Sequence, residues 1–405
     1  SNMSNYGVIH SKLKKGATDE SKTYEMYHDY EERVKYIKPH RVLALNRGEK
    51  EGILSVDISA DDDYIISFLE KKLIKDESTE SASIVKSAIR DSYKRLIIPS
   101  IEREVRADLK EVAETAAIEV FGENLENLIL TPPMKDIMVL GFDPAYRTGC
   151  KLAVVSPTSS VLNISVIYPH EPHNKWEESK KVLKDLFKKY NKDKDVKYVI
   201  VSEAGASVYS ASELAIKEFP DLTVEKRSAI SIARRLQDPL SELVKIDSKS
   251  IGVGQYQHDV NEKKLDESLD FVVSKCVNNV GVNINTASTS ILKYVSGLTK
   301  TSIDKIIGYR EKNGRINSRD ELVKGKVLTP KVYEQSIGFM RVIDGNNIMD
   351  ETSIHPESYA VASKLLEDIG YTAKDVGKEE LVKKLDGINL DEYSKKLGVD
   401  KYTLE

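Results

Sequence analysis

Cysteine and tryptophan are scarce in this sequence. Among 405 residues there are two cysteines, Cys150 and Cys276, and a single tryptophan, Trp176. The cysteines lie far apart and do not form a Cys-x-x-Cys pair, which argues against a zinc site and against a disulfide framework. Because chains without disulfides are typical of the reducing cytoplasm, we expect a cytoplasmic protein.

Long apolar runs and two well-known catalytic motifs are also missing. No run reaches the roughly 18 residues that a membrane-spanning helix needs, so we expect no membrane partner. Neither the phosphate-binding pattern GxxxxGKS/T nor the nucleophile pattern GxSxG occurs. The sequence therefore gives no support to an ATPase or to a serine hydrolase.

A strong charge of one sign is absent from the chain as a whole but present in one part of it. The sequence holds 61 Lys and Arg against 65 Asp and Glu, whereas residues 291–344 hold eleven Lys and Arg against six Asp and Glu. Such a local positive excess is compatible with a surface that faces phosphates and equally with a solvated helical surface. Charge alone leaves both open.

The length predicts two to four domains, and the patterns place four regions along the chain. We expect a helical region with a short β element at 1–135, an α/β domain at 136–260, a pair of helical hairpins at 261–345 and a helical segment at 346–405. Within the first region the pattern predicts a helix at about 23–35, a strand at 53–58 and helices from 62 to 121.

The second region has the element order of a ribonuclease-H-like α/β domain. Three strands at 137–142, 151–155 and 162–168 are joined by short turns, which predicts an antiparallel meander. A helix at 174–190 follows, and its spacing places Trp176 on the apolar face with Leu183 and Leu186. The apolar run at 196–202 is short enough for a buried strand.

One aspartate stands at the end of the first strand of that meander, in the stretch GFDPAYRTGCKLAVV. Asp143 could bind a metal for phosphodiester chemistry, in which two Mg²⁺ ions are held by several converging carboxylates. Glu203 and Asp259 are the candidates for the remaining carboxylates. Alternatively, Asp143 caps the turn that follows it and pairs with Arg147. The spacing leaves both interpretations open and favours the second, because well-separated acids are common in so charged a chain.

The third region contains two helical hairpins in tandem, which is the arrangement of a helix-hairpin-helix. Such a motif binds a nucleic-acid backbone because a glycine turn presents backbone N–H groups at a helix N-terminus beside lysines. In YVSGLTKTSIDKII, Gly297 opens the turn and Thr299 or Thr301 caps the next helix. The second turn, GKVLTPKV, fits less well. The nucleic-acid-binding residues that we predict are Gly297, Thr299, Lys300, Thr301, Lys305, Lys326, Thr329 and Lys331.

Two histidines lie in the loop that precedes the helix at 174–190. His170 and His173 flank prolines and have no partner at the i,i+4 spacing of a helical metal site. We therefore interpret them as surface residues.

Several long strings together closely resemble the Tex family of bacterial transcription accessory proteins. They include HRVLALNRGEKEG, GFDPAYRTGCKLAVV, EAGASVYSASELA, NTASTSILKYVSGL and HPESYA, and the similarity covers roughly residues 20–370. The resemblance implies a multidomain, mostly α-helical chain with an α/β ribonuclease-H-like domain of the YqgF type and tandem helix-hairpin-helix units. It also implies nucleic-acid binding linked to transcription, with RNA as the usual ligand.

The sequence departs from the family pattern in two ways. Members usually begin with a further helical region and end with an OB-fold RNA-binding domain, so the resemblance implies that this chain is a central fragment without either. Members also carry another strand and helix between Asn191 and the run at 196–202, where only a few lysines and aspartates stand here. Because a ribonuclease-H-like site draws a carboxylate from that strand, this departure weakens the nuclease hypothesis.

The favoured hypothesis is a nucleic-acid-binding transcription accessory protein whose ribonuclease-H-like domain is non-catalytic and which needs no cofactor. RNA or DNA, and the transcription machinery, are the expected partners. A Mg²⁺-dependent nuclease using Asp143, Glu203 and Asp259 is the first alternative. A protein-interaction scaffold on the transcription machinery is the second.

Overall fold

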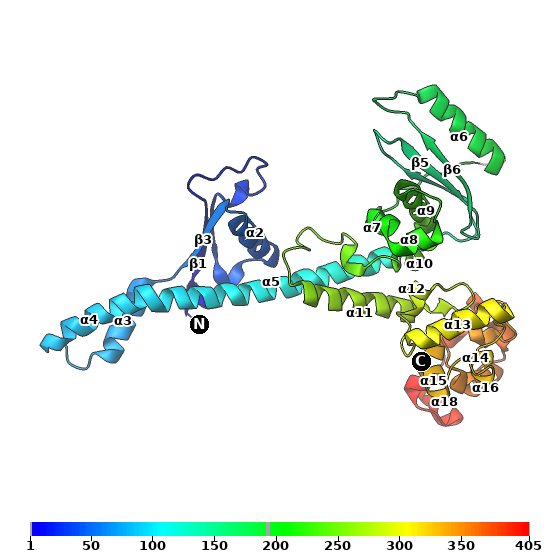
Figure 1. Cartoon of the computed structure of the whole chain (residues 1–405). Coiled ribbons are helices and arrows are strands. Elements are labelled where there is room, and N and C mark those ends of the chain that lie inside the picture. The colour runs from blue at the N-terminus through cyan, green and yellow to red at the C-terminus, as the bar shows by residue number, and fades with distance from the viewer. Residues whose placement is uncertain (1, 192–194, 405) are drawn as a thin grey trace. The chain divides into compact units, whose positions relative to one another are not determined.

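The computed structural model describes residues 2–191 and 195–404. The chain forms two compact units, one of residues 1–124 with 252–268 and one of residues 125–251 with 269–405, and helices dominate both (Figure 1). We refer to them as unit 1 and unit 2. Among the described residues no helix is long and apolar enough to cross a membrane.

Unit 1 contains a three-stranded antiparallel sheet in the order β2-β1-β3. Strand β3 confirms the strand expected at 53–58, but the helix expected at 23–35 is wrong, because that stretch contains strand β2 between two short 3-10 turns. In β2, Tyr30 packs edge-on against Tyr27 at 5.3 Å between ring centroids. The strand is specified by its pairing with β1, and a pairing between separate segments cannot be detected from the local periodicity of the sequence. The bounds are β1 Val8–Leu13, β2 Asp29–Arg33, β3 Leu54–Ser59, α1 Asn2–Tyr6 and α2 Pro39–Lys50.

The helices expected from 62 to 121 are present. They are α3 Asp62–Leu73, α4 Glu80–Ser92 and α5 Ile98–Ile129, with a π-helical turn at Tyr93–Ile97 (Figure 1). Pro99 lies just after this π-helical turn inside one continuous helical run from α4 to α5. Proline removes an intrahelical N–H, and the π-helical turn is the local irregularity beside it.

Unit 2 contains the predicted meander as a sheet in the order β4-β5-β6. Strand β5 is buried along its whole length because helices cover both of its faces. Cys150, Leu152 and Val154 pack with Leu186 of α6, while Ala153 packs with Ala229 and Ile230 of α9. The bounds are β4 Val139–Asp143, β5 Cys150–Val155, β6 Val161–Ile167, α6 Trp176–Tyr190, α7 Ala206–Ala211, α8 Glu213–Glu218, α9 Val224–Gln237 and α10 Pro239–Leu243.

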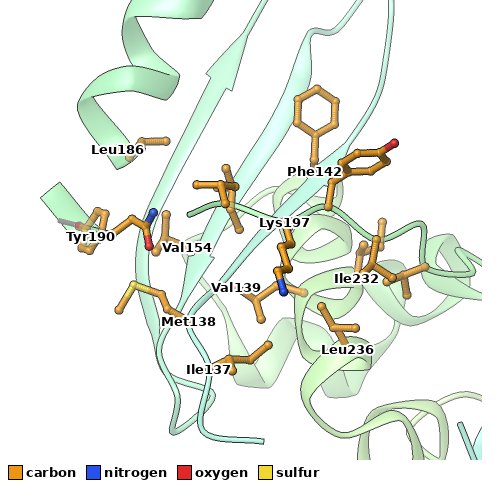
Figure 2. Close-up of a pocket in the computed structure, with 18 of the residues that line it drawn as sticks. Ile137, Met138, Val139, Phe142, Val154, Leu186, Tyr190, Lys197, Ile232 and Leu236 are labelled. Atoms are coloured by element: carbon orange, nitrogen blue, oxygen red, sulfur yellow. The ribbon is translucent and has the colours of Figure 1, made fainter. Parts of the chain in front are cut away.

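Two expectations for this domain are wrong. The run 196–202 forms no strand, and Tyr198 and Ile200 are each 92% exposed. Among the described residues strand β4 has a hydrogen-bonded neighbour on one edge only. A cavity of about 930 Å³ lies between β4, α6, α9 and residues 195–203 (Figure 2). An apolar run predicts burial but does not identify the strand that would pair with it. Trp176, expected on the apolar face of α6, is 60% exposed at the first position of that helix.

The rest of unit 2 is helical. The hairpins expected in the third region comprise α12 Thr289–Leu292, α13 Lys300–Asn313, α14 Glu321–Lys324 and α15 Pro330–Ser336, preceded by α11 Glu262–Val280. Two short parallel strands, β7 Val282–Asn283 and β8 Met340–Arg341, flank them. The final helices are α16 Tyr359–Asp368, α17 Glu379–Asp386, α18 Leu390–Leu397 and α19 Lys401–Leu404.

Candidate nucleic-acid interface

The turn between α12 and α13 is built around Gly297. Its φ of +84° lies in the left-handed region, which a residue with a side chain adopts only with strain. A Cβ placed there would come within 2.8 Å of the Cβ of Gln335 and 3.0 Å of its backbone carbonyl group. Glycine is therefore required twice, for the backbone angle and for the close packing of the turn against α15.

Thr299 caps α13, which settles the choice between the two predicted threonines. Its hydroxyl oxygen accepts from the N–H of Ser302 at 3.3 Å, and the Ser302 hydroxyl accepts from the N–H of Thr299 at 2.7 Å. This reciprocal capping box fixes where the helix begins. Thr301 is the second helical residue and is exposed.

The start of α13 has the electrostatic character of an anion site. The amides of Lys300 and Thr301 belong to the first turn, whose N–H groups have no intrahelical acceptor. The positive end of the helix dipole lies at the same place. Lys300 and Lys305 are exposed on this helix, while Ile303 and Ile306 are buried beneath it. The lysines and the backbone N–H groups of the first turn therefore lie on the exposed side of α13, and the buried isoleucines fix the position of this helix.

Asn278 of α11 supports the turn through hydrogen bonds to its backbone. We did not predict this residue from the sequence. Its amide nitrogen donates to the carbonyl oxygen of Tyr294 at 3.0 Å, and its amide oxygen accepts from the N–H of Ser296 at 3.0 Å. Ser274, one turn earlier in α11, donates to the same Tyr294 carbonyl at 3.2 Å. No local signal could have found Asn278, because its partners are 16 and 18 residues away.

The second turn, between α14 and α15, presents fewer backbone donors. Thr329 caps α15 by accepting from the N–H of Val332 at 3.4 Å. Pro330 occupies the first helical position and has no N–H to offer. Lys326 adopts a φ of +55°, and both Lys326 and Lys331 are exposed. This turn can contribute positive charge, but it presents fewer free backbone N–H groups to a phosphate than the first turn does.

A fully buried arginine ties the second hairpin to the C-terminal helices. Arg319 is 1% exposed and donates to the carbonyl oxygens of Met340, Thr352 and Ile354, at 2.6 to 2.9 Å. It also donates to the Tyr359 hydroxyl at 2.7 Å, and that hydroxyl in turn donates to the carboxylate of Asp350 at 2.6 Å. The role of Arg319 is to fix the scaffold, since it reaches no surface.

Asp143 ends β4 and stands opposite Lys151 of β5 in the strand register. Within the described residues its carboxylate forms neither the turn cap nor the ion pair with Arg147 that the sequence favoured. The Lys151 ammonium instead donates to the backbone and hydroxyl oxygens of Thr148. The turn after β4 is therefore held by Thr148 and Lys151, and Asp143 is left out of it.

Glu203 is exposed in a turn that Arg235 of α9 holds. One guanidinium nitrogen of Arg235 donates to the carbonyl oxygens of Ser202 at 2.8 Å and Ala204 at 2.7 Å, on either side of Glu203. Burial lowers the pKa of Arg235, and the charges of Glu242 and Glu203 partly offset this. Arg235 is thus the anchor of the loop that carries Glu203.

Asp259 belongs to unit 1, whereas Asp143 and Glu203 belong to unit 2. The Asp259 carboxylate accepts two hydrogen bonds from the guanidinium of Arg47, one of them 2.7 Å long, and the Arg47 guanidinium lies 4.7 Å from the ring centroid of Tyr256. In residues 2–191 and 195–404 no three His, Cys, Asp or Glu side chains are grouped so that they could hold a metal ion. Among the described residues, neither Asp143 and Glu203 within unit 2 nor Asp259 within unit 1 therefore belongs to a group that could hold a metal ion.

Comparison with known families matches most of the chain. The Tex central region matches residues 1–121, a helix-hairpin-helix motif matches 277–341 and an HHH domain matches 347–405. The YqgF-like domain of Tex proteins matches in two parts, 137–194 and 190–237. The parts meet where the sequence lacks the expected strand and helix, and residues 192–194 there lie outside the described part of the chain. The segment predicted only as helical at 346–405 is thus a further HHH domain.

Similar proteins occur in bacteria and in animals. The protein YdcI of Bacillus subtilis is 51% identical over 98% of this chain and 59% of its own length. The transcriptional accessory protein Tex of Neisseria gonorrhoeae is 40% identical over 94% of this chain and 54% of its own. The human S1 RNA-binding domain-containing protein 1 is 35% identical over 94% and 47%. The chain therefore spans about half the length of these relatives.

Proposed function

Because this chain carries the central and YqgF-like regions of Tex proteins and so belongs to the Tex family, we propose that it is a transcription accessory protein that binds nucleic acid, preferentially RNA, through its first helix-hairpin-helix turn. The observation that carries the proposal is the turn from Gly297 to Lys300. It combines a glycine that both the backbone angle and the packing against α15 require, a capped helix start and exposed lysines.

In this proposal a backbone phosphate lies at the start of α13. The first-turn amides donate to its oxygens, the helix dipole favours its charge, and Lys300 and Lys305 add long-range attraction. The second turn supplies Lys326 and Lys331 as point charges. Since all these contacts address the backbone, binding depends on salt and on strand shape and hardly on sequence.

The ribonuclease-H-like domain acts in this proposal as a scaffold without catalysis, and binding needs no cofactor. The engagement of Asp259 by Arg47 supports this, because two nitrogens of the Arg47 guanidinium donate to Oδ2 of that carboxylate and compete with any metal ion for it. The proposal includes a role in the cytoplasm at the transcription machinery, and the resemblance to the transcriptional accessory protein Tex supports it. The nuclease hypothesis, with Mg²⁺ held by Asp143 and Glu203, remains the alternative that an experiment must address.

The proposal is tested by replacing Lys300 and Lys331 with alanine, singly and together. We expect each replacement to weaken binding equally for unrelated single-stranded sequences. The slope of log affinity against log salt should fall by about 0.7 for each phosphate of a single strand that the variant no longer neutralises. Fluorescence anisotropy of labelled oligonucleotides at several salt concentrations measures both quantities.

The matched control is Lys71→Ala, because Lys71 is equally exposed but lies in α3 of unit 1. That variant should keep the affinity and the salt slope of the parent chain. If Lys300→Ala and Lys331→Ala together leave the slope unchanged, the hairpin turns do not contact phosphates, and the scaffold hypothesis would take their place.

A further inference from the structure

The loop surface at one end of the YqgF-like sheet gathers exposed rings from two separate segments. Tyr146, in the turn after β4, is 73% exposed, and Trp176, at the start of α6, is 60% exposed. His170 and His173 lie in the loop between β6 and α6. We call these four residues the ring surface. They lie on unit 2, on a domain separate from the hairpins.

One ring contact and one hydrogen bond join the two segments. The rings of Tyr146 and His170 lie 5.5 Å apart between centroids, and those of Tyr168 and His173 lie 4.7 Å apart in an edge-on arrangement. The Nε2–H of His173 donates to the carbonyl oxygen of Arg147 at 3.2 Å. The turn that carries Tyr146 is therefore fixed to the loop that carries the histidines.

Gly149 makes this arrangement possible. Its φ is +77°, and a Cβ there would come within 2.6 Å of the Tyr168 ring. The turn can thus lie directly on Tyr168, whose carbonyl oxygen accepts from the N–H of Lys175 at 2.9 Å, next to Trp176. The backbone that carries the exposed rings is consequently fixed at these points, so less backbone entropy is lost when a ligand binds.

Arg147 gives the same surface a cation. It is exposed, and in the described part of the chain its guanidinium group has neither an ion-pair nor a hydrogen-bond partner. Lys175 is also exposed but pairs with Glu178 at 3.3 Å, and Glu171 and Glu177 are exposed in the same stretch of the chain. Because the charges of the surface nearly balance, it suits a ligand recognised by stacking with some phosphate contact better than a duplex held by charge alone.

We propose that the ring surface stacks the unpaired bases of single-stranded nucleic acid, with Arg147 contacting the backbone beside them. Exposed Tyr, Trp and His rings next to a free arginine are the combination on which successive bases stack without regard to sequence. A duplex keeps its bases paired and does not offer them to such a surface. The inference extends the proposed nucleic-acid binding to a second site and rests on it.

The single tryptophan of the chain makes the proposal directly testable. Because Trp176 is the only tryptophan, the intrinsic tryptophan fluorescence of the whole chain reports on this surface alone. We expect oligouridylate and oligodeoxythymidylate of about 12 nucleotides, within the site size of a single-strand-binding surface, to quench it in a saturable way. An abasic oligonucleotide of equal length, which keeps the phosphates but lacks bases, should not quench it.

Variants of Tyr146 separate stacking from general binding. Tyr146→Ala should weaken the affinity measured by quenching about 5- to 150-fold, the range for losing one stacked base, whereas Tyr146→Phe should retain it. Tyr64→Ala is the control, because Tyr64 is 61% exposed in α3 of unit 1. Comparing the two oligonucleotides shows whether RNA or DNA is preferred.

Several results would overturn the inference. Quenching by the abasic strand, equal quenching by a duplex, or unchanged affinity in Tyr146→Ala would each exclude base stacking here, and the surface would then be a contact for another protein. Anisotropy of the same oligonucleotides separates this failure from failure of the hairpin site. Binding seen by anisotropy without Trp176 quenching removes only the ring surface. An anisotropy salt slope that Lys300→Ala leaves unchanged, with Trp176 quenching intact, removes only the hairpin site.

Discussion

Glu218 joins three side chains at one point of the YqgF-like domain. It accepts from the Tyr209 hydroxyl at 2.5 Å and from the Lys245 ammonium at 3.3 Å, and it pairs with Arg234. Burial by itself would raise the pKa of Glu218, but Lys245, Tyr209 and Arg234 together outweigh burial and lower it below its usual value of 4.5. Replacing this carboxylate therefore tests, in one variant, the ion pairs and the hydrogen bond that connect α8 with α7, α9 and Lys245.

We predict that Glu218→Gln destabilises the folded chain by about 1–3 kcal/mol at neutral pH, because three donors lose a charged acceptor. A carboxyl with a depressed pKa contributes stability that is present above about pH 4.5 and lost as the pH falls through its lower value in the folded state. The difference between parent and variant should therefore shrink below about pH 4.5. Urea unfolding at a series of pH values measures it.

Glu213→Gln provides the control, since Glu213 is exposed in the same helix α8. Its effect should be small at every pH. A difference between parent and Glu218→Gln that stays constant from about pH 7 to about pH 3 would show that the carboxylate charge plays no part.

Side chains whose hydrogen-bond partners are distant in the sequence could not be identified from the sequence alone. The hydrogen bonds of Asn278 reach 16 and 18 residues along the chain, those of Arg235 reach more than 30, and those of Arg319 reach up to 40. Thr299, in contrast, caps a helix through a residue three positions away. The helix cap at Thr299 was predictable for that reason, whereas the long-range hydrogen bonds that support the turns were not.

At the scale of elements, the turn at Gly297 is the one on which the candidate interface depends. We predict that Gly297→Ala lowers both the melting temperature and the affinity for single-stranded RNA, because the new Cβ meets Gln335 and forces the turn away from α15. Thermal unfolding and anisotropy measure the two effects.

Gly398→Ala is the matched control. Gly398 ends α18 with a φ of +69°, and a Cβ at this position would meet no heavy atom within 4 Å apart from those of its chain neighbours. This change therefore carries only the backbone cost of about 1–2 kcal/mol. It should leave RNA affinity unchanged. An equal loss of stability in both variants, with normal RNA binding by Gly297→Ala, would contradict the role assigned to the turn.

Elements with a strong local pattern were predictable, and those specified by a distant partner were not. The meander β4-β5-β6 and helix α11 follow from alternation and from helical spacing. Strand β2 was expected as a helix because its pairing with β1 is not a local property. The run 196–202 was expected as a strand because its apolar character predicts burial, yet no strand pairs with it among the residues that the structure describes.

At the scale of the whole chain, contacts group the regions differently from their order in the sequence. Residues 252–268 pack with unit 1, although our sequence boundaries divided them between the second and third regions. The return of a segment to an earlier unit cannot be detected in composition or periodicity. The basic stretch 291–344, by contrast, is visible in the sequence and contains both hairpin turns.

The central claim is that this chain binds nucleic-acid backbones through the hairpin turns and leaves the strands intact. The most direct test is a salt-titrated binding assay with single-stranded RNA, single-stranded DNA and duplex DNA, run with Mg²⁺ and followed by a gel for cleavage. We predict that the affinity falls steeply with rising salt and is lower in the double variant Lys300→Ala, Lys331→Ala. We also predict that every strand remains uncut. Absence of salt-dependent binding, or Mg²⁺-dependent cleavage that Asp143→Asn abolishes, would contradict the account.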